Sequence, residues 1–296
     1  MDTARAIATR FFGAVPDTVE AIEGLGSVNR MFIARQGDQA IIVRLPKEED
    51  QWRAEAFYEK ERWCIEAAKT VADIPGPEVL AQGIFDGWPY QIQRFIVGVN
   101  GEQSGLDATP FNRLLGEYTR RFHAISLTGF GETLPDFLAP DGRARWHRFI
   151  TYNLESLMAD DPLLALGVYH SDQRPRITQR FESLYTLDAP IGLTHGDLSP
   201  RNTIITPDQT MVLIDWGCAE AHLVPHYDLY YMPLEFWNDF LDGYGWPHEN
   251  RAELRAEVEN LALLKAFDLV RWAIDRCPMR ITELADAARL RAQTVA

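Results

Sequence analysis

The chain has 296 residues, of which 29 are Lys or Arg and 43 are Asp or Glu, so its formal net charge is −14. Hydrophobic residues make up 46% and charged residues 24%, a composition that is typical of folded proteins and excludes wholesale disorder. At this length one hydrophobic core is usually replaced by two, so two lobes are expected. The acidic charge excludes a nucleic-acid partner, which needs a basic face, and leaves cationic small molecules possible.

The sequence also predicts where the protein works. No apolar stretch approaches the roughly 20 residues that cross a bilayer, and the first residues lack the uninterrupted apolar region of a secretory signal. The three cysteines, Cys64, Cys218 and Cys277, are far apart and form no CxxC pair, which favours reduced thiols over a disulfide framework or a zinc site. We therefore expect a cytoplasmic protein with no membrane partner.

The first ninety-odd residues alternate β-like runs with turns. Residues 28–35 and 40–45 are rich in Val, Ile and aromatics and flank a four-residue turn, which predicts a hairpin. Residues 51–70 have the pattern of a helix that stops before a Pro-Gly-Pro turn. Two further β-like runs cover 78–84 and 89–97.

The pattern changes after Gly98. Helical periodicity appears over residues 111–126, 176–187 and 251–275, and short β runs over 191–194, 203–205 and 211–214. The aromatic-rich segment 129–167 is assigned to neither class. We predict an α+β protein with a strand-rich N-terminal lobe over 1–97, a hinge near 93–98 and a mainly helical C-terminal lobe over 98–296.

Two short motifs carry the chemistry. The stretch HGDLSPRN covers residues 195–202, and DWG follows at 215–217 after an apolar strand. This spacing supplies Asp197 as a base for a hydroxyl, and Asn202 and Asp215 as two oxygen ligands, the donors that Mg²⁺ prefers. Either motif alone is ordinary turn chemistry, whereas their conjunction indicates phosphoryl transfer.

HGDLSPRN followed by IDWG resembles the aminoglycoside phosphotransferase family, small-molecule kinases that share the protein-kinase fold. The resemblance implies a bilobal kinase-like fold and ATP or GTP as phosphoryl donor. It implies that Asp197 is the catalytic base and that Asn202 and Asp215 hold Mg²⁺ on the phosphates. His195 would brace the loop through a hydrogen bond.

The same resemblance assigns phosphate contacts to the N-terminal lobe. The turn that contains Gly24, Gly26 and Ser27 lies where a glycine-rich loop would let backbone N–H groups approach phosphate oxygens. Arg44 occupies the third-strand position of the phosphate-binding cation, where protein kinases have lysine.

The helix over 51–70 should supply a carboxylate partner for Arg44. Glu55, Glu59 and Glu61 are all candidates, and Glu55 and Glu59 share a helix face. We favour Glu55, because the family commonly has its glutamate early in this helix. The backbone of the hinge residues is expected to meet the nucleotide base; these are Gln93, Arg94, Phe95 and Ile96.

The acceptor is a small molecule that carries a hydroxyl. On a helical wheel of residues 234–244, Glu235, Asp239 and Asp242 gather opposite an aromatic face. Like charges at this spacing repel unless a cation relieves them, which favours a cationic acceptor. The family resemblance implies an aminoglycoside or aminocyclitol as that acceptor and a role in antibiotic resistance. Two alternatives stay open: a kinase of a metabolic alcohol such as homoserine, choline or an amino sugar, and a catalytically inactive nucleotide-binding module. A monomer or weak homodimer is expected.

Overall fold

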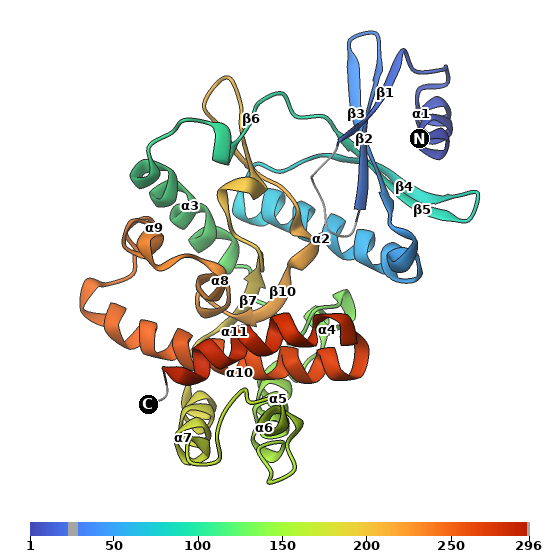
Figure 1. Ribbon diagram of the computed structural model, residues 1–296. Helices are drawn as coiled ribbons and strands as arrows, with labels where there is room; N and C mark the ends of the chain where they lie inside the picture. The colour runs from blue at the N-terminus through green and yellow to red at the C-terminus, as the bar shows by residue number, and fades with distance from the viewer. Residues whose placement is uncertain (23–28, 295–296) are drawn as a thin grey trace. The chain divides into compact units, whose positions relative to one another are not determined.

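The computed structural model describes residues 1–22 and 29–294, which form two compact units (Figure 1). Unit 1 consists of Met1–Phe111, Glu132–Pro135 and His195–Glu220. Unit 2 consists of Asn112–Gly131, Asp136–Thr194 and Ala221–Ala296. The segment that contains both predicted catalytic motifs therefore packs with the N-terminal residues and not with its neighbours in sequence.

Unit 1 is built on a five-stranded antiparallel sheet of order β1-β2-β3-β5-β4. Its strands are β1 (Thr18–Ile22), β2 (Asn29–Gln36), β3 (Gln39–Pro46), β4 (Val79–Phe85) and β5 (Trp88–Arg94). The β2–β3 hairpin closes on the pair Gln36 and Gln39, and Gly37 takes the positive φ of 54° that this tight turn requires. The hairpin and the next two strands were predicted from their alternating pattern.

The two faces of this sheet carry different helices. On one face Ile41, Val43 and Leu45 of β3 pack with Ile7 of helix α1 (Asp2–Phe12) in a hydrophobic core. Arg44 lies between them in sequence and therefore points to the other face, because side chains alternate along a strand. On that face its partner comes from helix α2 (Ala54–Ala72), which follows a 3₁₀ turn over Glu48–Arg53.

A second, three-stranded sheet holds the catalytic segment in unit 1. Its strands β6 (Val99–Asn100), β8 (Thr203–Ile205) and β9 (Met211–Leu213) are antiparallel in the order β6-β8-β9. Short 3₁₀ turns over Pro200–Asn202 and Trp216–Cys218 flank β8 and β9. Both predicted catalytic motifs thus lie at the ends of short strands.

Unit 2 is mainly helical. Helix α10 (Arg251–Arg276) runs beside α11 (Ile281–Gln293), and the two form the red pair in Figure 1. The remaining elements of this part of the chain are α3 (Ala108–His123), α4 (Leu134–Leu138), α5 (Gly142–Glu155), α6 (Pro162–Ala165), β7 (Ile191–Thr194), α7 (Arg174–Ser183), β10 (Glu220–Leu223), α8 (His226–Tyr231) and α9 (Trp237–Tyr244), of which α3, α4 and β10 begin in unit 1. Strands β7 and β10 pair in a two-stranded sheet. A core of buried side chains from α5, α7 and α10 includes Trp146, Phe181 and Phe267.

The predicted α+β class, with a strand-rich N-terminal sheet and a helical C-terminal part, is confirmed. The segment 129–167, which the sequence left unassigned, contains α4, α5 and α6. The boundary after residue 97 and the hinge stay predictions, since the compact units divide the chain differently. Among the described helices, none combines the length and the apolar composition that a membrane span requires.

Candidate active site

The loop that contains His195 and Asp197 follows strand β7 and is held by its backbone. Gly196 adopts a φ of +75°, and a Cβ at this position would lie 2.1 Å from the carbonyl oxygen of Cys218. Only glycine fits such a contact in this backbone conformation. His195 is fully buried, with its Nε2 3.0 Å from the carbonyl oxygen of Ile214 and its ring packed on Trp216. These contacts connect the loop to the residues on both sides of Asp215.

Asp197 lies at the surface of this loop with 28% of its side chain exposed. Its Oδ2 accepts a hydrogen bond of 2.9 Å from Nδ2 of Asn202, and its backbone carbonyl accepts a second one of 2.8 Å from the same nitrogen. Nη2 of Arg201 lies 2.8 Å from Oδ1 and 2.9 Å from Oδ2 of Asp197. The carboxylate predicted to be the base is therefore fixed by two neighbours of its own loop.

Asp215 follows β9 in the left-handed conformation, with φ 61° and ψ 60°. This region is uncommon for a residue that is not glycine, and such strain is concentrated at functional positions. The N–H of Ile214 donates to the carbonyl oxygen of Asn202 at 3.0 Å, which places the two predicted metal ligands on hydrogen-bonded segments. Nearly half of the Asp215 side chain, 49%, is exposed.

The donors present here fit Mg²⁺. The contacts of Asn202 within the described chain use its amide nitrogen, which leaves its amide oxygen available as a ligand. Asp215 adds a solvent-facing carboxylate, and Mg²⁺ is bound by one or two such oxygens together with phosphates and water. No cluster of three His, Cys, Asp or Glu side chains suited to a metal occurs among the described residues.

Arg44 forms a buried ion pair with Glu61 of α2. Its Nη1 lies 2.5 Å from Oε2 of Glu61 and 3.3 Å from Oε1 of Gln91, and its Nη2 lies 3.6 Å from Oδ1 of Asp215. The prediction that Glu55 is the partner is wrong. Glu55 lies in the first turn of α2 and is exposed, whereas Glu61 is completely buried.

The phase of helix α2 explains this correction. Its buried positions include Ala54, Tyr58, Ile65 and Ala68, which recur at the spacing of one helix face. Glu61 is the one carboxylate on that face of α2, a helix that is described in full. A helical wheel aligned on the apolar positions of 51–70 could therefore have selected Glu61 from the sequence.

Electrostatics couples these groups. Burial raises the pKa of the Glu61 carboxyl, and the opposing attraction of Arg44 does not fully cancel this effect. For Arg44 burial acts against the charge, but Glu61 and Asp215 outweigh it and raise the pKa of the guanidinium. Arg44 thus remains a fixed cation between one buried and one solvent-facing carboxylate.

Helix α2 makes two further contacts with the segment after Asp215, neither predicted from the sequence. Nζ of Lys60 donates to the carbonyl oxygen of Ala219 at 3.0 Å. The ring of Phe57 lies so close to Gly217 that a Cβ there would be 2.2 Å from it. The pairing of α2 with this segment holds Asp215 beside Arg44.

The other predicted nucleotide contacts are only partly described. Gly24, Gly26 and Ser27 lie outside the described residues. At the predicted hinge the N–H of Arg94 donates to the carbonyl of Glu78 and that of Phe95 to the carbonyl of Ala40, while Gln93 is paired with β3. The backbone N–H groups of Arg94 and Phe95 are therefore already used within the sheet. The prediction that this segment contacts the nucleotide base is left with the N–H group of Ile96 and with backbone carbonyl groups of the hinge residues.

The predicted acceptor carboxylates belong to unit 2, where arginines contact two of them. Nη2 of Arg113 lies 3.1 Å from Asp242, and its Nε lies 3.8 Å from Asp239. Arg251 donates to Asp242 at 2.7 Å, and this hydrogen bond lowers the pKa of that carboxyl. Glu235 is exposed in a 3₁₀ turn before α9. The repulsion that favoured a cationic substrate is thus relieved within the chain, and the acceptor role stays a prediction.

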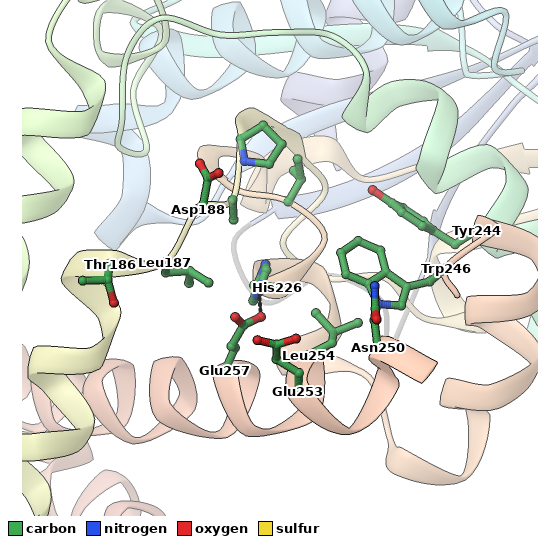
Figure 2. A pocket seen from close by; sticks show the side chains of 13 residues that line it. Thr186, Leu187, Asp188, His226, Tyr244, Trp246, Asn250, Glu253, Leu254 and Glu257 are labelled. Atoms are coloured by element: carbon green, nitrogen blue, oxygen red, sulfur yellow. Dashed lines mark hydrogen bonds and ion pairs between the residues drawn. The ribbon is translucent and has the colours of Figure 1, made fainter. Parts of the chain in front are cut away.

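Unit 2 also contains a pocket of about 370 Å³. Figure 2 shows Glu253 and Glu257 rising from α10 toward it, with Trp246 on one side. Nε2 of His226 lies 2.9 Å from Oε2 of Glu257. None of its lining residues is a predicted site residue. This pocket therefore does not coincide with the candidate active site.

Comparison with solved structures agrees with this fold. An aminoglycoside phosphotransferase, APH(2")-IIia, in complex with GDP and kanamycin, aligns with a TM-score of 0.67 at 18% identity over 97% of each chain. A thermostable mutant of APH(4)-Ia with ADP and hygromycin B gives 0.66 at 19% identity over 99% of this chain and 97% of that one. A protein assigned as fructosamine-3-kinase, from Haemophilus somnus 129PT, gives 0.64 at 12% identity over 99% and 97%.

No curated protein sequence matches the chain. The sequence profile of the phosphotransferase enzyme family, APH, matches residues 18–274. That range includes β1 to β5, both catalytic motifs and nearly all of α10. The family resemblance read from HGDLSPRN and IDWG is confirmed, and the chain belongs to the phosphotransferase enzyme family.

Proposed function

We propose that this phosphotransferase is a Mg²⁺-dependent kinase that moves the γ-phosphoryl group of ATP or GTP to a hydroxyl of a small cationic molecule of the aminoglycoside or aminocyclitol class. One observation carries the proposal. Unit 1 joins a surface carboxylate (Asp197), two oxygen ligands (Asn202 and Asp215) and a buried cation (Arg44) through the contacts given above. Phosphoryl transfer needs this set of groups.

Each residue then has a definite task. The acceptor hydroxyl oxygen attacks the γ-phosphorus, its proton passes to the carboxylate of Asp197, and the bond from the γ-phosphorus to the bridging oxygen breaks to release the nucleoside diphosphate. Asn202 orients Asp197 through its amide nitrogen. Arg44, fixed by Glu61, directs its second amino group toward the phosphates beside Asp215.

Asn202 and Asp215 are the residues that would hold Mg²⁺. When bound, the ion neutralises phosphate charge that develops during transfer. The chain supplies their geometry: Asp215 is set by its left-handed backbone and Asn202 by the hydrogen bond from Ile214.

The acceptor class rests on the charge and on the neighbours of similar fold. A net charge of −14 favours a cationic ligand. Two of the solved structures of similar fold are complexes, one with kanamycin and one with hygromycin B. The fructosamine-3-kinase of similar fold keeps a metabolic alcohol kinase as the second candidate. The presence of Asp197, Asn202 and Asp215 argues against an inactive nucleotide-binding module.

A panel assay tests the reaction. Consumption of ATP and of GTP with Mg²⁺ is measured with kanamycin, hygromycin B, a fructosamine, homoserine and choline as acceptors. We expect turnover with an aminoglycoside, and expression of the protein should then raise the drug concentration that a sensitive bacterium survives. Turnover only with the fructosamine, homoserine or choline, and with neither kanamycin nor hygromycin B, would replace the proposal with the metabolic kinase.

Two variants test the division of labour. Asp197→Ala should lower transfer by about 10²–10⁴-fold, because the base is lost, and leave nucleotide affinity nearly intact. Asp215→Ala should weaken Mg²⁺–nucleotide binding about tenfold or more, because it removes a ligand. Asp208→Ala, in the exposed turn between β8 and β9, is the matched control. Equal nucleotide affinities in both site variants would show that these roles are misassigned.

A further inference from the structure

The predicted base does not stand free in its loop. Nη2 of Arg201 contacts both carboxylate oxygens of Asp197, at 2.8 and 2.9 Å, and Nδ2 of Asn202 contacts one of them at 2.9 Å. The Arg201 side chain is itself 59% exposed, so it can leave this position without opening the core. The attraction of Asp197 raises the pKa of the Arg201 guanidinium, which remains charged throughout.

This contact decides what can reach Asp197. A carboxylate oxygen accepts the proton of an attacking hydroxyl only through a lone pair that faces that hydroxyl. Here Nη2 of Arg201 takes one lone pair of each carboxylate oxygen and Nδ2 of Asn202 takes a second one of Oδ2, which leaves a single lone pair on Oδ1. The charge-assisted contacts of Arg201 are about twice as strong as neutral hydrogen bonds. A water molecule offers no charge to replace the guanidinium. An acceptor that carries an ammonium group beside its hydroxyl does.

We infer that Arg201 is a positioning residue that covers Asp197 and suppresses phosphoryl transfer to water until a cationic acceptor displaces it. This inference rests on the proposed function. The suppressed reaction is hydrolysis: a water oxygen would bond to the γ-phosphorus, its proton would pass to Asp197, and the bond to the bridging oxygen would break to give nucleoside diphosphate and phosphate. Arg201 restricts the site that would take that proton to the remaining lone pair of Oδ1.

The chain offers a matched control for this pair. Arg62 and Glu66 form an exposed i, i+4 ion pair on α2, with Nε 2.9 Å from the carboxylate. The spacing is that of Asp197 and Arg201, and the pair also belongs to unit 1. Arg62→Gln therefore removes the same charge from a comparable pair that has no place in the site.

The experiment measures phosphate release from Mg²⁺·ATP without acceptor, for the wild type, Arg201→Gln, Arg201→Lys and Arg62→Gln. We expect Arg201→Gln to hydrolyse ATP about fivefold faster than the wild type, as the loss of one exposed charge-assisted contact implies. Arg201→Lys should fall between them, because the ammonium retains the charge on a shorter side chain that lacks the guanidinium nitrogen in contact with both oxygens. Arg62→Gln should match the wild type, and the affinity for ADP in calorimetry should stay within about twofold in every variant.

Two results overturn the inference. Hydrolysis by Arg201→Gln that equals or falls below that of the wild type shows that Arg201 does not restrain Asp197. A loss of ADP affinity of about tenfold assigns it to phosphate binding instead. A wild-type protein that binds no ADP and turns over no acceptor of the panel fails the proposed function itself, and the calorimetry separates that case.

Discussion

Among the residues that the structure describes, each unit contains one buried arginine that is paired with a buried carboxylate. In unit 1 Arg44 contacts Glu61, and in unit 2 Arg271 contacts Asp161 at 2.9 Å. The two arginines differ in what their second amino group meets. For Arg44 it is the half-exposed Asp215, whereas for Arg271 it is Oδ1 of the buried Asn153 at 2.9 Å.

The two buried carboxylates, Glu61 and Asp161, also differ in the hydrogen bonds that they accept. Asp161 accepts from the hydroxyl of Tyr169 and from the N–H of Leu163 in addition to Arg271, so both of its carboxylate oxygens are paired, although Nε of Arg271 has no hydrogen-bond partner among the described residues. Oε1 of Glu61 has no hydrogen-bond partner among the described residues. Burial and pairing alone therefore do not identify an active site. The two pairs differ in exposure: Arg44 also faces the half-exposed Asp215, whereas both partners of Arg271 are buried, and this difference favours the pair of unit 1 as part of the candidate site.

The largest effect should come from Arg44→Met. Its loss removes the cation at the site and leaves Glu61 buried without its partner, which costs about 3–5 kcal/mol of unfolding free energy. We expect kcat/KM to fall about 100-fold or more. In the double variant Arg44→Met/Glu61→Met urea midpoints should largely recover, while activity does not. Recovery of both would mean that Arg44 only supports the fold.

Arg271→Met should lower stability but leave activity unchanged, in contrast to Arg44→Met. The free energy of unfolding should again fall by about 3–5 kcal/mol, because Asp161 is left as an unpaired buried charge. At a temperature where the variant is folded, kcat should equal that of the wild type. Arg271→Met/Asp161→Asn should regain stability, since the amide oxygen still caps α6 through Leu163. A loss of kcat in the stable double variant would place this network in the catalytic machinery.

Two glycines extend the comparison to the backbone. Gly196 and Gly167 both have positive φ, 75° and 63°, but an added Cβ meets the Cys218 carbonyl at the first and nothing within 4 Å at the second. Gly167→Ala should cost about 1–2 kcal/mol of conformational strain. Gly196→Ala should cost more and also reduce activity, because the loop must shift. Equal unfolding midpoints for the two variants would contradict the tight contact at Gly196.

The smallest effect is a pH dependence that arises in unit 2. Burial, with Lys265 nearby, holds the pKa of His222 well below 6.5, so the ring is neutral in the folded state and protonated in the unfolded state at lower pH. The unfolded state then binds the extra proton, and stability falls as the pH drops below about 6.5, by roughly 1.4 kcal/mol per pH unit.

The variant His222→Phe should flatten this slope in urea titrations between pH 7.5 and 5.5. His248→Phe serves as the control, since the His248 side chain is 80% exposed. An unchanged slope in His222→Phe would show that another group takes up the proton.

The sequence predicted the parts of the fold that local patterns determine. Runs rich in Val, Ile and aromatics on both sides of a turn predicted the β2–β3 hairpin, and a short β run predicted strand β7. The spacing of the two motifs selected the candidate catalytic residues. Sequence patterns did not predict contacts that depend on a partner far away in the chain. The carboxylate of Asp242 meets Arg113, which lies 129 positions away, and no local pattern reports that contact.

Glu61 is an intermediate case. Its burial follows from the phase of the helix. The family resemblance instead favours Glu55 as the partner of Arg44, because the family commonly has its glutamate early in this helix. The assignment of 195–220 to unit 1 depends on contacts such as Lys60 with Ala219, 159 residues apart, and could not have been derived from periodicity.

Each unit is assembled from three separate segments of the chain, and this arrangement has a consequence for biosynthesis. A ribosome completes residues 1–111 early, but the strands β8 and β9 that finish unit 1 emerge only after most of unit 2 has been made. Unit 2 in turn waits for residues beyond 221. Unit 1 is complete only once residue 220 has been made, so neither unit can fold fully when residues 1–111 emerge, and long-range closure of this kind is slow. A nascent chain that stalls after residue 111 would lack every residue of the phosphoryl-transfer motifs, and we expect it to depend on chaperones rather than to persist as a separate domain.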